Sequence, residues 1–270
     1  MRYIRRFTCI IFLITLAAWG ASTFIANMNK DEEPPVITAD LDQISVSVHD
    51  GREALLKGLK ATDNKDGDIT DNIIIGKQTK FVEKGKTNID FIVFDSSNNV
   101  ATYNREVKYV DYVSPVISLS EPLIYSVGDS VTVLDRLTIV DSIDGNITDK
   151  VKIVSSDIDK QTPGVYSLGV EASNRFGDIV SLKLPVNIVE KGSLDNIIEM
   201  DDYMVVVNKG DVFDPLSYIE GLMFTDGTEV NRSSVTVESN VDTSVEGVYQ
   251  VLYYYNNGDG MTSLTVEVRE

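Results

Sequence analysis

The residues best suited to chemistry in this sequence lie in two copies of an aspartate-rich motif. Residues 63–70 read DNKDGDIT, and residues 141–148, which follow 78 positions later, read DSIDGNIT. Carboxylate oxygens are the ligands that calcium prefers in proteins. The candidate calcium ligands are Asp63, Asp66, Asp68, Asp141 and Asp144, joined in the first copy by a carboxylate such as Asp95.

A structural role for the same aspartates is the alternative to metal binding. The motif is not an EF-hand, because that loop carries acids at positions 1, 3 and 5, whereas positions 3 and 5 counted from Asp63 are Lys65 and Gly67. In the structural interpretation the aspartates accept backbone N–H bonds in a tight turn while Ile69 fills the core. Calcium is the one cofactor that the sequence leaves open, and it indicates no other.

Enzymatic chemistry is not indicated. His49 is the only histidine, and it ends an alternating run with no nucleophile motif nearby. Carboxylate pairs of the kind that glycosidases use are present, but they recur at repeat positions and are explained by the repeat. The sequence has no glycine-rich phosphate loop and no Cys/His cluster. It therefore predicts a protein that is not an enzyme, and an unrecognised hydrolase is the alternative.

The charge balance limits the partners. The chain has 42 acidic and 24 basic residues and a net charge of −18. Such a surface repels nucleic acid phosphates and anionic lipid headgroups, so nucleic acid is not an expected partner. Because 43% of the residues are hydrophobic, the acidity belongs to a folded protein. The only cysteine is Cys9, so no disulfide can form within the chain and the domains must be held by their cores.

The N-terminus predicts membrane targeting. Residues 1–6 are basic, and residues 7–26 contain no charged side chain. A helix of that length rises about 30 Å, which is enough to cross a bilayer, and the arginines would stay on the cytoplasmic side. The alternative is a signal peptide cleaved after Ala18-Trp19-Gly20. In either case residues 27–270 are expected outside the cell, either on a single-pass signal-anchor in the cell membrane or released.

Alternation of apolar residues predicts β-strands in the rest of the chain. A glycine begins a strand at Gly85, Gly164 and Gly247, and the apolar residues at positions +4, +6 and +8 should point inward. These inward residues are Ile89, Phe91 and Val93, then Leu168, Val170 and Ala172, then Val251, Tyr253 and Tyr255. Each strand is followed by turn residues and a second alternating strand, the arrangement of a hairpin.

The period near 80 residues predicts three domains. After a polar spacer at residues 27–33, they cover residues 34–111, 112–191 and 192–270, and the third keeps a diverged copy of the aspartate motif at residues 225–230. About seven short strands per domain are typical of an immunoglobulin-like β-sandwich. The predicted fold class is all-β, with three tandem immunoglobulin-like β-sandwich domains after an N-terminal transmembrane helix.

These motifs resemble the immunoglobulin-like repeats of bacterial surface proteins, a domain family of unknown function related to repeats in insecticidal crystal proteins and cell-wall proteins. The second domain matches at residues 141–148 and at Gly164-Val165-Tyr166. The first has Thr87 in place of the tyrosine, and the third keeps Gly247-Val248-Tyr249 but loses most of the aspartate turn. The resemblance implies display on the outside of the cell.

We therefore expect a membrane-tethered extracellular array that acts in surface display, in adhesion or as a structural spacer. Its partners would be the membrane, through residues 7–26, and a protein or polysaccharide at the cell surface. The alternative is a secreted module that binds cell-wall polysaccharide. In the third domain Tyr254 and Leu252 alternate with the inward residues, so they should lie on the outer face and form the binding surface.

Overall fold

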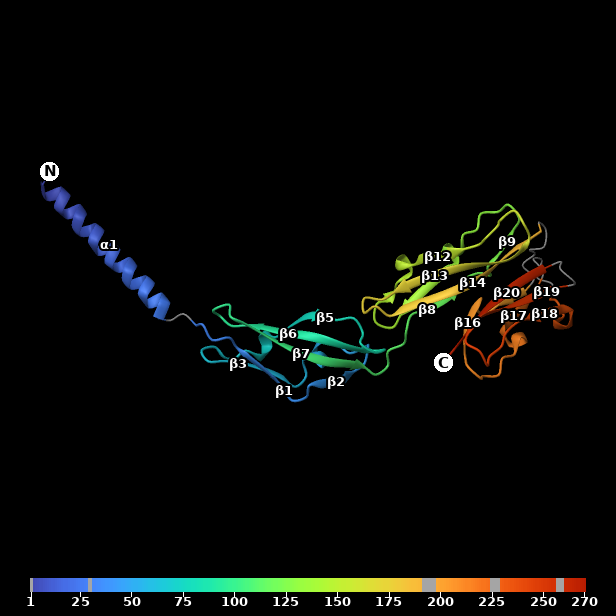
Figure 1. Ribbon diagram of the computed structural model, residues 1–270, viewed down its shortest axis with the longest axis horizontal. Coiled ribbons are helices and arrows are strands. Elements are labelled where there is room, and N and C mark those ends of the chain that lie inside the picture. The colour runs from blue at the N-terminus through green and yellow to red at the C-terminus, as the bar shows by residue number, and fades with distance from the viewer. Residues whose placement is uncertain (1, 29–30, 191–197, 224–228, 256–259) are drawn as a thin grey trace. The chain divides into compact units, whose positions relative to one another are not determined.

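The computed structural model describes the whole chain except residues 1, 29–30, 191–197, 224–228 and 256–259. It begins with one long helix, α1 (Arg2–Met28), and continues almost entirely in β-strands (Figure 1). The predicted all-β fold after an N-terminal helix is therefore confirmed. The chain divides into two compact units, the first formed by residues 1–79 and 86–110 and the second by residues 80–85 and 111–270.

Helix α1 contains a stretch, Tyr3–Phe24, that is long and apolar enough to cross a membrane. None of this stretch is buried against the rest of the protein. Its large side chains, such as Phe12 at 64% exposure and Trp19 at 68%, therefore find no protein core of their own. A membrane anchor and a signal sequence share these properties.

Unit 1 contains two sheets. The first has the order β1 (Val36–Ala39), β3 (Leu59–Asp63), β4 (Gly67–Asp68), and all its pairs are antiparallel. The second has the order β2 (Gln43–Val46), β7 (Val100–Tyr109), β6 (Lys86–Phe94), β5 (Ile74–Gln78), with β2 parallel to β7. A five-residue helix, α2 (Arg52–Leu56), and the 3₁₀ turn η1 (Thr70–Asn72) connect these strands.

The core of unit 1 forms where the alternation predicted it. Ile89, Phe91 and Val93 on β6 are completely buried. Ile69, which follows the aspartate turn, is 7% exposed and belongs to the same cluster. The prediction that this isoleucine fills the core is therefore confirmed.

Unit 2 begins with a pair of sheets that repeats the topology of unit 1. The three-stranded sheet has the order β11 (Gly145–Asn146), β10 (Leu137–Asp141), β8 (Val116–Leu119). The four-stranded sheet has the order β12 (Lys152–Ser156), β13 (Gly164–Ser173), β14 (Ile179–Val189), β9 (Ile124–Ser126). Strand β9 is parallel to β14, just as β2 is parallel to β7. The 3₁₀ turns here are η2 (Val133–Arg136) and η3 (Thr148–Lys150).

A second pair of sheets completes unit 2. Strand β15 (Ile198–Met200) pairs with β17 (Ile219–Leu222), and the four-stranded sheet has the order β16 (Met204–Asn208), β20 (Gly260–Arg269), β19 (Gly247–Tyr255), β18 (Val235–Ser239). The 3₁₀ turns are η4 (Pro215–Tyr218) and η5 (Arg232–Ser234). Val251 and Tyr253 are completely buried as predicted, whereas the predicted inward residue Tyr255 is only half-buried.

Three hydrophobic clusters form among the described residues, one in unit 1 and two in unit 2. Met204 from β16 belongs to the cluster of the preceding sandwich, so the two cores of unit 2 are adjacent. The predicted domain boundary at residue 191, most of the turn predicted at residues 257–260 and most of the third aspartate motif at residues 225–230 lie outside the described residues. The three-domain division therefore stays a prediction.

Candidate functional site

The first aspartate turn joins β3 to β4 in unit 1. Asp63 Oδ1 accepts hydrogen bonds from the backbone N–H groups of Asp66, at 2.8 Å, and Lys65, at 2.9 Å. These bonds hold the pKa of the Asp63 carboxyl below its ordinary value, because they favour the ionised form. Gly67 has a φ of 72°, a left-handed conformation that suits glycine. One Asp63 oxygen therefore shapes the turn.

Asp66 and Asp68 use their carboxylates within the loops. Asp66 accepts a bond from the Ser96 N–H at 2.6 Å and from the Ser96 hydroxyl at 2.8 Å, which ties this turn to the turn after β6. Asp68 Oδ1 accepts bonds from the Thr70 hydroxyl at 2.6 Å and the Thr70 N–H at 3.0 Å. The hydrogen bond from the Thr70 hydroxyl is the main reason why the pKa of Asp68 lies below its ordinary value.

The second aspartate turn reproduces these bonds in unit 2. Asp141 Oδ1 accepts from the N–H groups of Asp144, at 2.7 Å, and Ile143, at 2.9 Å. Asp144 accepts from the Arg175 N–H at 2.8 Å and forms ion pairs of 3.2 Å with Arg175 Nε and Lys150 Nζ. Asn146 replaces Asp68 and accepts the corresponding bond from Thr148. The same bonds therefore shape the turn in both units.

A cluster of three carboxylates distinguishes unit 1. Asp31, Asp63 and Asp95 each contribute an oxygen, and these oxygens lie within 4.8 Å of one another. Asp31 is 5% exposed and Asp95 is 7% exposed. The second oxygen of Asp63, Oδ2, is buried and has no hydrogen-bond partner. This is the one such acidic group found in the described part of the chain.

Asp31 is the member of this cluster that sequence reasoning missed. The sequence assigns it to a polar spacer, but its backbone C=O accepts a hydrogen bond from Asn99 Nδ2 at 3.1 Å. Its carboxylate accepts the Glu33 N–H, also at 3.1 Å. Asp31 is therefore packed against unit 1, although it precedes Pro34. No local sequence signal marked it, because its burial depends on Asn99, which lies 68 residues away in the sequence.

The corresponding place in unit 2 holds a hydrogen-bond network that includes an amide and a phenol. Asn174 stands where unit 1 has Asp95, and its Nδ2 donates to Asp141 Oδ2 at 3.0 Å and to the Tyr112 hydroxyl at 2.8 Å. The Tyr112 hydroxyl donates to Asp178 Oδ2 at 2.7 Å. Burial, followed by this bond to Asp178, raises the pKa of Tyr112 far above its ordinary value. The buried oxygen of Asp141 thus has the donors that Asp63 lacks.

The predicted binding residues Leu252 and Tyr254 both line a groove of about 360 Å³ in unit 2. Pro163, Val165 and Met261 also line it. Both side chains are half-buried, and they alternate with the completely buried Val251 and Tyr253. The Tyr254 hydroxyl donates a hydrogen bond to Glu238 at 3.3 Å. The pKa of Tyr254 lies above its ordinary value, mainly because the side chain is partly buried.

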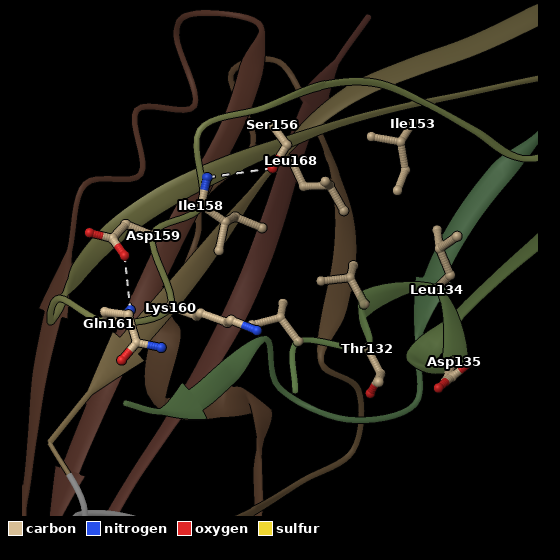
Figure 2. Close-up of a pocket in the computed structure, with 12 residues that line it drawn as sticks. Thr132, Leu134, Asp135, Ile153, Ser156, Ile158, Asp159, Lys160, Gln161 and Leu168 are labelled. Atoms are coloured by element: carbon tan, nitrogen blue, oxygen red, sulfur yellow. Dashed lines mark hydrogen bonds between the residues drawn. The ribbon is translucent and has the colours of Figure 1, made fainter. Parts of the chain in front are cut away.

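A second hollow of about 650 Å³ lies beside β12 and η2, and the sequence did not single it out. Figure 2 shows apolar side chains around it, including Leu134, Ile158 and Leu168. The hydrogen bonds drawn there join Gln161 to Asp159 and Ile158 to Ser156, so these polar groups serve their own loop.

No known protein-family model matches the chain. The pesticidal crystal protein Cry22Aa of Bacillus thuringiensis is 28% identical to it over 206 residues, which make up 72% of this chain and 27% of that protein. The chain therefore spans just over a quarter of this curated relative. The match supports in part the resemblance to repeats of insecticidal crystal proteins.

Two solved structures illustrate the likeness in three dimensions. The CBM51-2 and INT domains of Clostridium perfringens ZmpB align with a TM-score of 0.29 and 16% identity, covering 56% of this chain and 41% of that one. Domains 4–9 of the surface-layer protein SbsC align with a TM-score of 0.22 and 14% identity, covering 86% and 50%. TM-scores in this range carry no inference about function.

Proposed function

We propose that the protein is a non-enzymatic, membrane-tethered array of immunoglobulin-like modules that presents a binding or structural surface outside the cell. The observation that carries the proposal is the apolar stretch Tyr3–Phe24, which no other part of the protein buries. Lipid is the medium that removes so much apolar surface from water. The charge-free run at residues 7–26 follows Arg5 and Arg6, which favours a cytoplasmic N-terminus.

The β-rich units supply the surface in this proposal. They contain no cysteine, since Cys9 lies in α1, so they can fold outside the cell on hydrophobic cores without a disulfide. The groove lined by Leu252 and Tyr254 offers an aromatic face, a hydroxyl and apolar neighbours. Such a combination suits a protein or a polysaccharide partner, since tyrosine gives a large contact area at low entropic cost.

Fractionation of cells that express the full chain tests the tether. The protein should stay in the membrane pellet after alkaline carbonate washing, and its mass should be that of the uncleaved chain. The variant Leu13→Arg/Ile14→Arg should leave the membrane fraction, because each arginine at a helix centre costs about 2.5–3.5 kcal/mol on insertion. Val212→Arg, at a position 98% exposed in unit 2, is the control and should stay with the membrane.

The secreted polysaccharide-binding module is the outcome that would contradict the tether. It would place the protein in the medium with a mass shortened by the N-terminal 20 residues, matching cleavage after Gly20. A wild-type protein removed by carbonate would also contradict an integral anchor.

A further inference from the structure

The carboxylates of Asp31, Asp63 and Asp95 converge, and the exposed Lys65 in the turn is a positive side chain whose charge acts on Asp63. None of the ion pairs among the described residues includes any of the three. Two of the three are more than nine-tenths buried, which weakens the screening of their mutual repulsion by water. Three like charges in such a place favour a bound cation.

The buried oxygen of Asp63 is a second and independent indication. Asp63 Oδ1 already serves the turn, and the bonds from Lys65 and Asp66 fix the orientation of the carboxylate. Asp63 Oδ2 is thereby buried beside the other two carboxylates with no hydrogen-bond donor. A buried carboxylate oxygen without a partner is destabilising unless a cation or a donor satisfies it.

Unit 2 shows how the same fold satisfies this oxygen without a cation. The turn after β6 and the turn after β13 have the same hydrogen bonds: Asp95 Oδ1 accepts the N–H groups of Ser97 and Asn99, and Asn174 Oδ1 accepts those of Phe176 and Asp178. Asn174 then turns an N–H₂ donor toward Asp141, whereas Asp95 has a second carboxylate oxygen, Oδ2, which accepts a hydrogen bond from Asn99 Nδ2 at 2.7 Å.

We propose that Asp31, Asp63 and Asp95 bind one calcium ion in unit 1, and that Tyr112 and Asn174 replace this ion in unit 2. Calcium binds oxygen at about 2.3–2.6 Å, so ligands on opposite sides of one ion are up to about 5 Å apart. Oxygens that lie within 4.8 Å of one another fit that requirement. An all-oxygen set disfavours zinc, which prefers nitrogen and sulfur. Asp66 and Asp68 are not members of this group of converging carboxylates, and the proposal does not use them as ligands.

Calcium titration of the full chain in detergent tests the site. Isothermal titration calorimetry at about 0.15 M salt should detect one specific site per chain, and dissociation constants of about 10⁻⁴–10⁻³ M are typical of extracellular modules. Thermal unfolding of unit 1 should shift upward with CaCl₂ more than with equal MgCl₂, because a ligand that binds only the native state stabilises it.

Three variants separate the site from the general acidity of the surface. Asp31→Asn should weaken calcium binding about tenfold or more, and its amide oxygen can still accept the Glu33 N–H. Asp68→Asn removes the same charge nearby and should bind calcium as the wild type does, since Asn146 fills that position in unit 2. Asp95→Asn removes another of the three proposed ligands and serves if Asp31→Asn fails to fold. Circular dichroism in the absence of calcium shows whether each variant is folded.

The proposal is overturned by any of three results. The first is an increase in the unfolding temperature with calcium that is no larger than the increase with magnesium. The second is unchanged calcium affinity in both Asp31→Asn and Asp95→Asn. The third is a loss of calcium affinity in Asp68→Asn equal to the loss in Asp31→Asn. The site does not depend on the tether, so these results are independent of the fractionation experiment.

Discussion

At the scale of single residues, each aspartate turn uses the two oxygens of its first carboxylate differently. Oδ1 of Asp63 and of Asp141 accepts two backbone N–H groups and closes the turn. The surroundings of Oδ2 differ between the units. In unit 1 they are the carboxylates of Asp31 and Asp95, and in unit 2 they are the Asn174 amide and the Tyr112 phenol. The same turn, repeated in the two units, is therefore surrounded by different polar groups in each.

Glu267 on β20 predicts a pH-dependent stability in unit 2. It is 8% exposed, its Oε2 is buried without a partner, and burial raises the pKa of its carboxyl. A raised folded-state pKa means that stability is fully present below the unfolded pKa of about 4.3 and is lost as the pH rises through the folded pKa. Glu267→Gln should therefore stabilise unit 2 at pH 7 by about 1–3 kcal/mol and have little effect near pH 4.

Urea unfolding at both pH values, followed by circular dichroism, measures this difference. Glu238→Gln on β18 of the same sheet is the control, because Glu238 is exposed. An equal effect of Glu267→Gln at pH 4 and pH 7 would show that the ionised carboxylate is not the cause.

At the scale of elements, strand β6 offers a direct test of its register. Phe91 is completely buried, whereas Phe94 on the same strand is 47% exposed. Phe91→Ala should lower the free energy of unfolding of unit 1 by about 3–5 kcal/mol, because it leaves a cavity in the core. Phe94→Ala should cost less than about 1 kcal/mol, as expected of a surface position. Similar costs, measured by urea unfolding, would contradict the register.

The groove on β19 predicts where a partner binds. Tyr254→Ser should reduce attachment of the protein to its cell-surface partner about tenfold or more, because it removes the aromatic face. Tyr254→Phe keeps the ring and loses only the hydroxyl bond to Glu238, so it should retain most of the attachment. Crosslinking on intact cells with quantification of the captured partner gives the comparison. Unchanged attachment in Tyr254→Ser would exclude this groove.

The strands could be predicted from the sequence because their periodicity is local. Every second side chain of β6 and β13 meets the core, and this leaves a visible alternation. Helix α2 has only five residues, too few to show a helical period. The parallel pairing of β2 with β7 and the burial of Asp31 depend on contacts across the fold. Asn99, which holds Asp31, is 68 residues away in the sequence, and no local pattern records such a contact.

At the scale of the whole molecule, the proposed account joins an apolar helix to strongly acidic β-rich units. The whole chain has a net charge of −18, and the helix contributes three arginines and no acid, so the rest of the chain carries −18 − 3 = −21. Such a charge keeps the units away from anionic lipid headgroups, which suits modules displayed in the aqueous phase beside a membrane. The helix thus favours the lipid bilayer and the units favour water, so the proposed tether holds the units beside the membrane.

Cysteine accessibility on intact cells tests this central claim most directly. Cys9 is the only cysteine, so the variant Cys9→Ser/Ser181→Cys places one thiol at an exposed position of β14 in unit 2. A membrane-impermeant maleimide should label this variant fully on intact cells, with no increase after lysis, while wild-type Cys9 in the helix should stay unlabelled on intact cells. Labelling of the Ser181→Cys thiol only after lysis would place the units inside the cell and contradict the account.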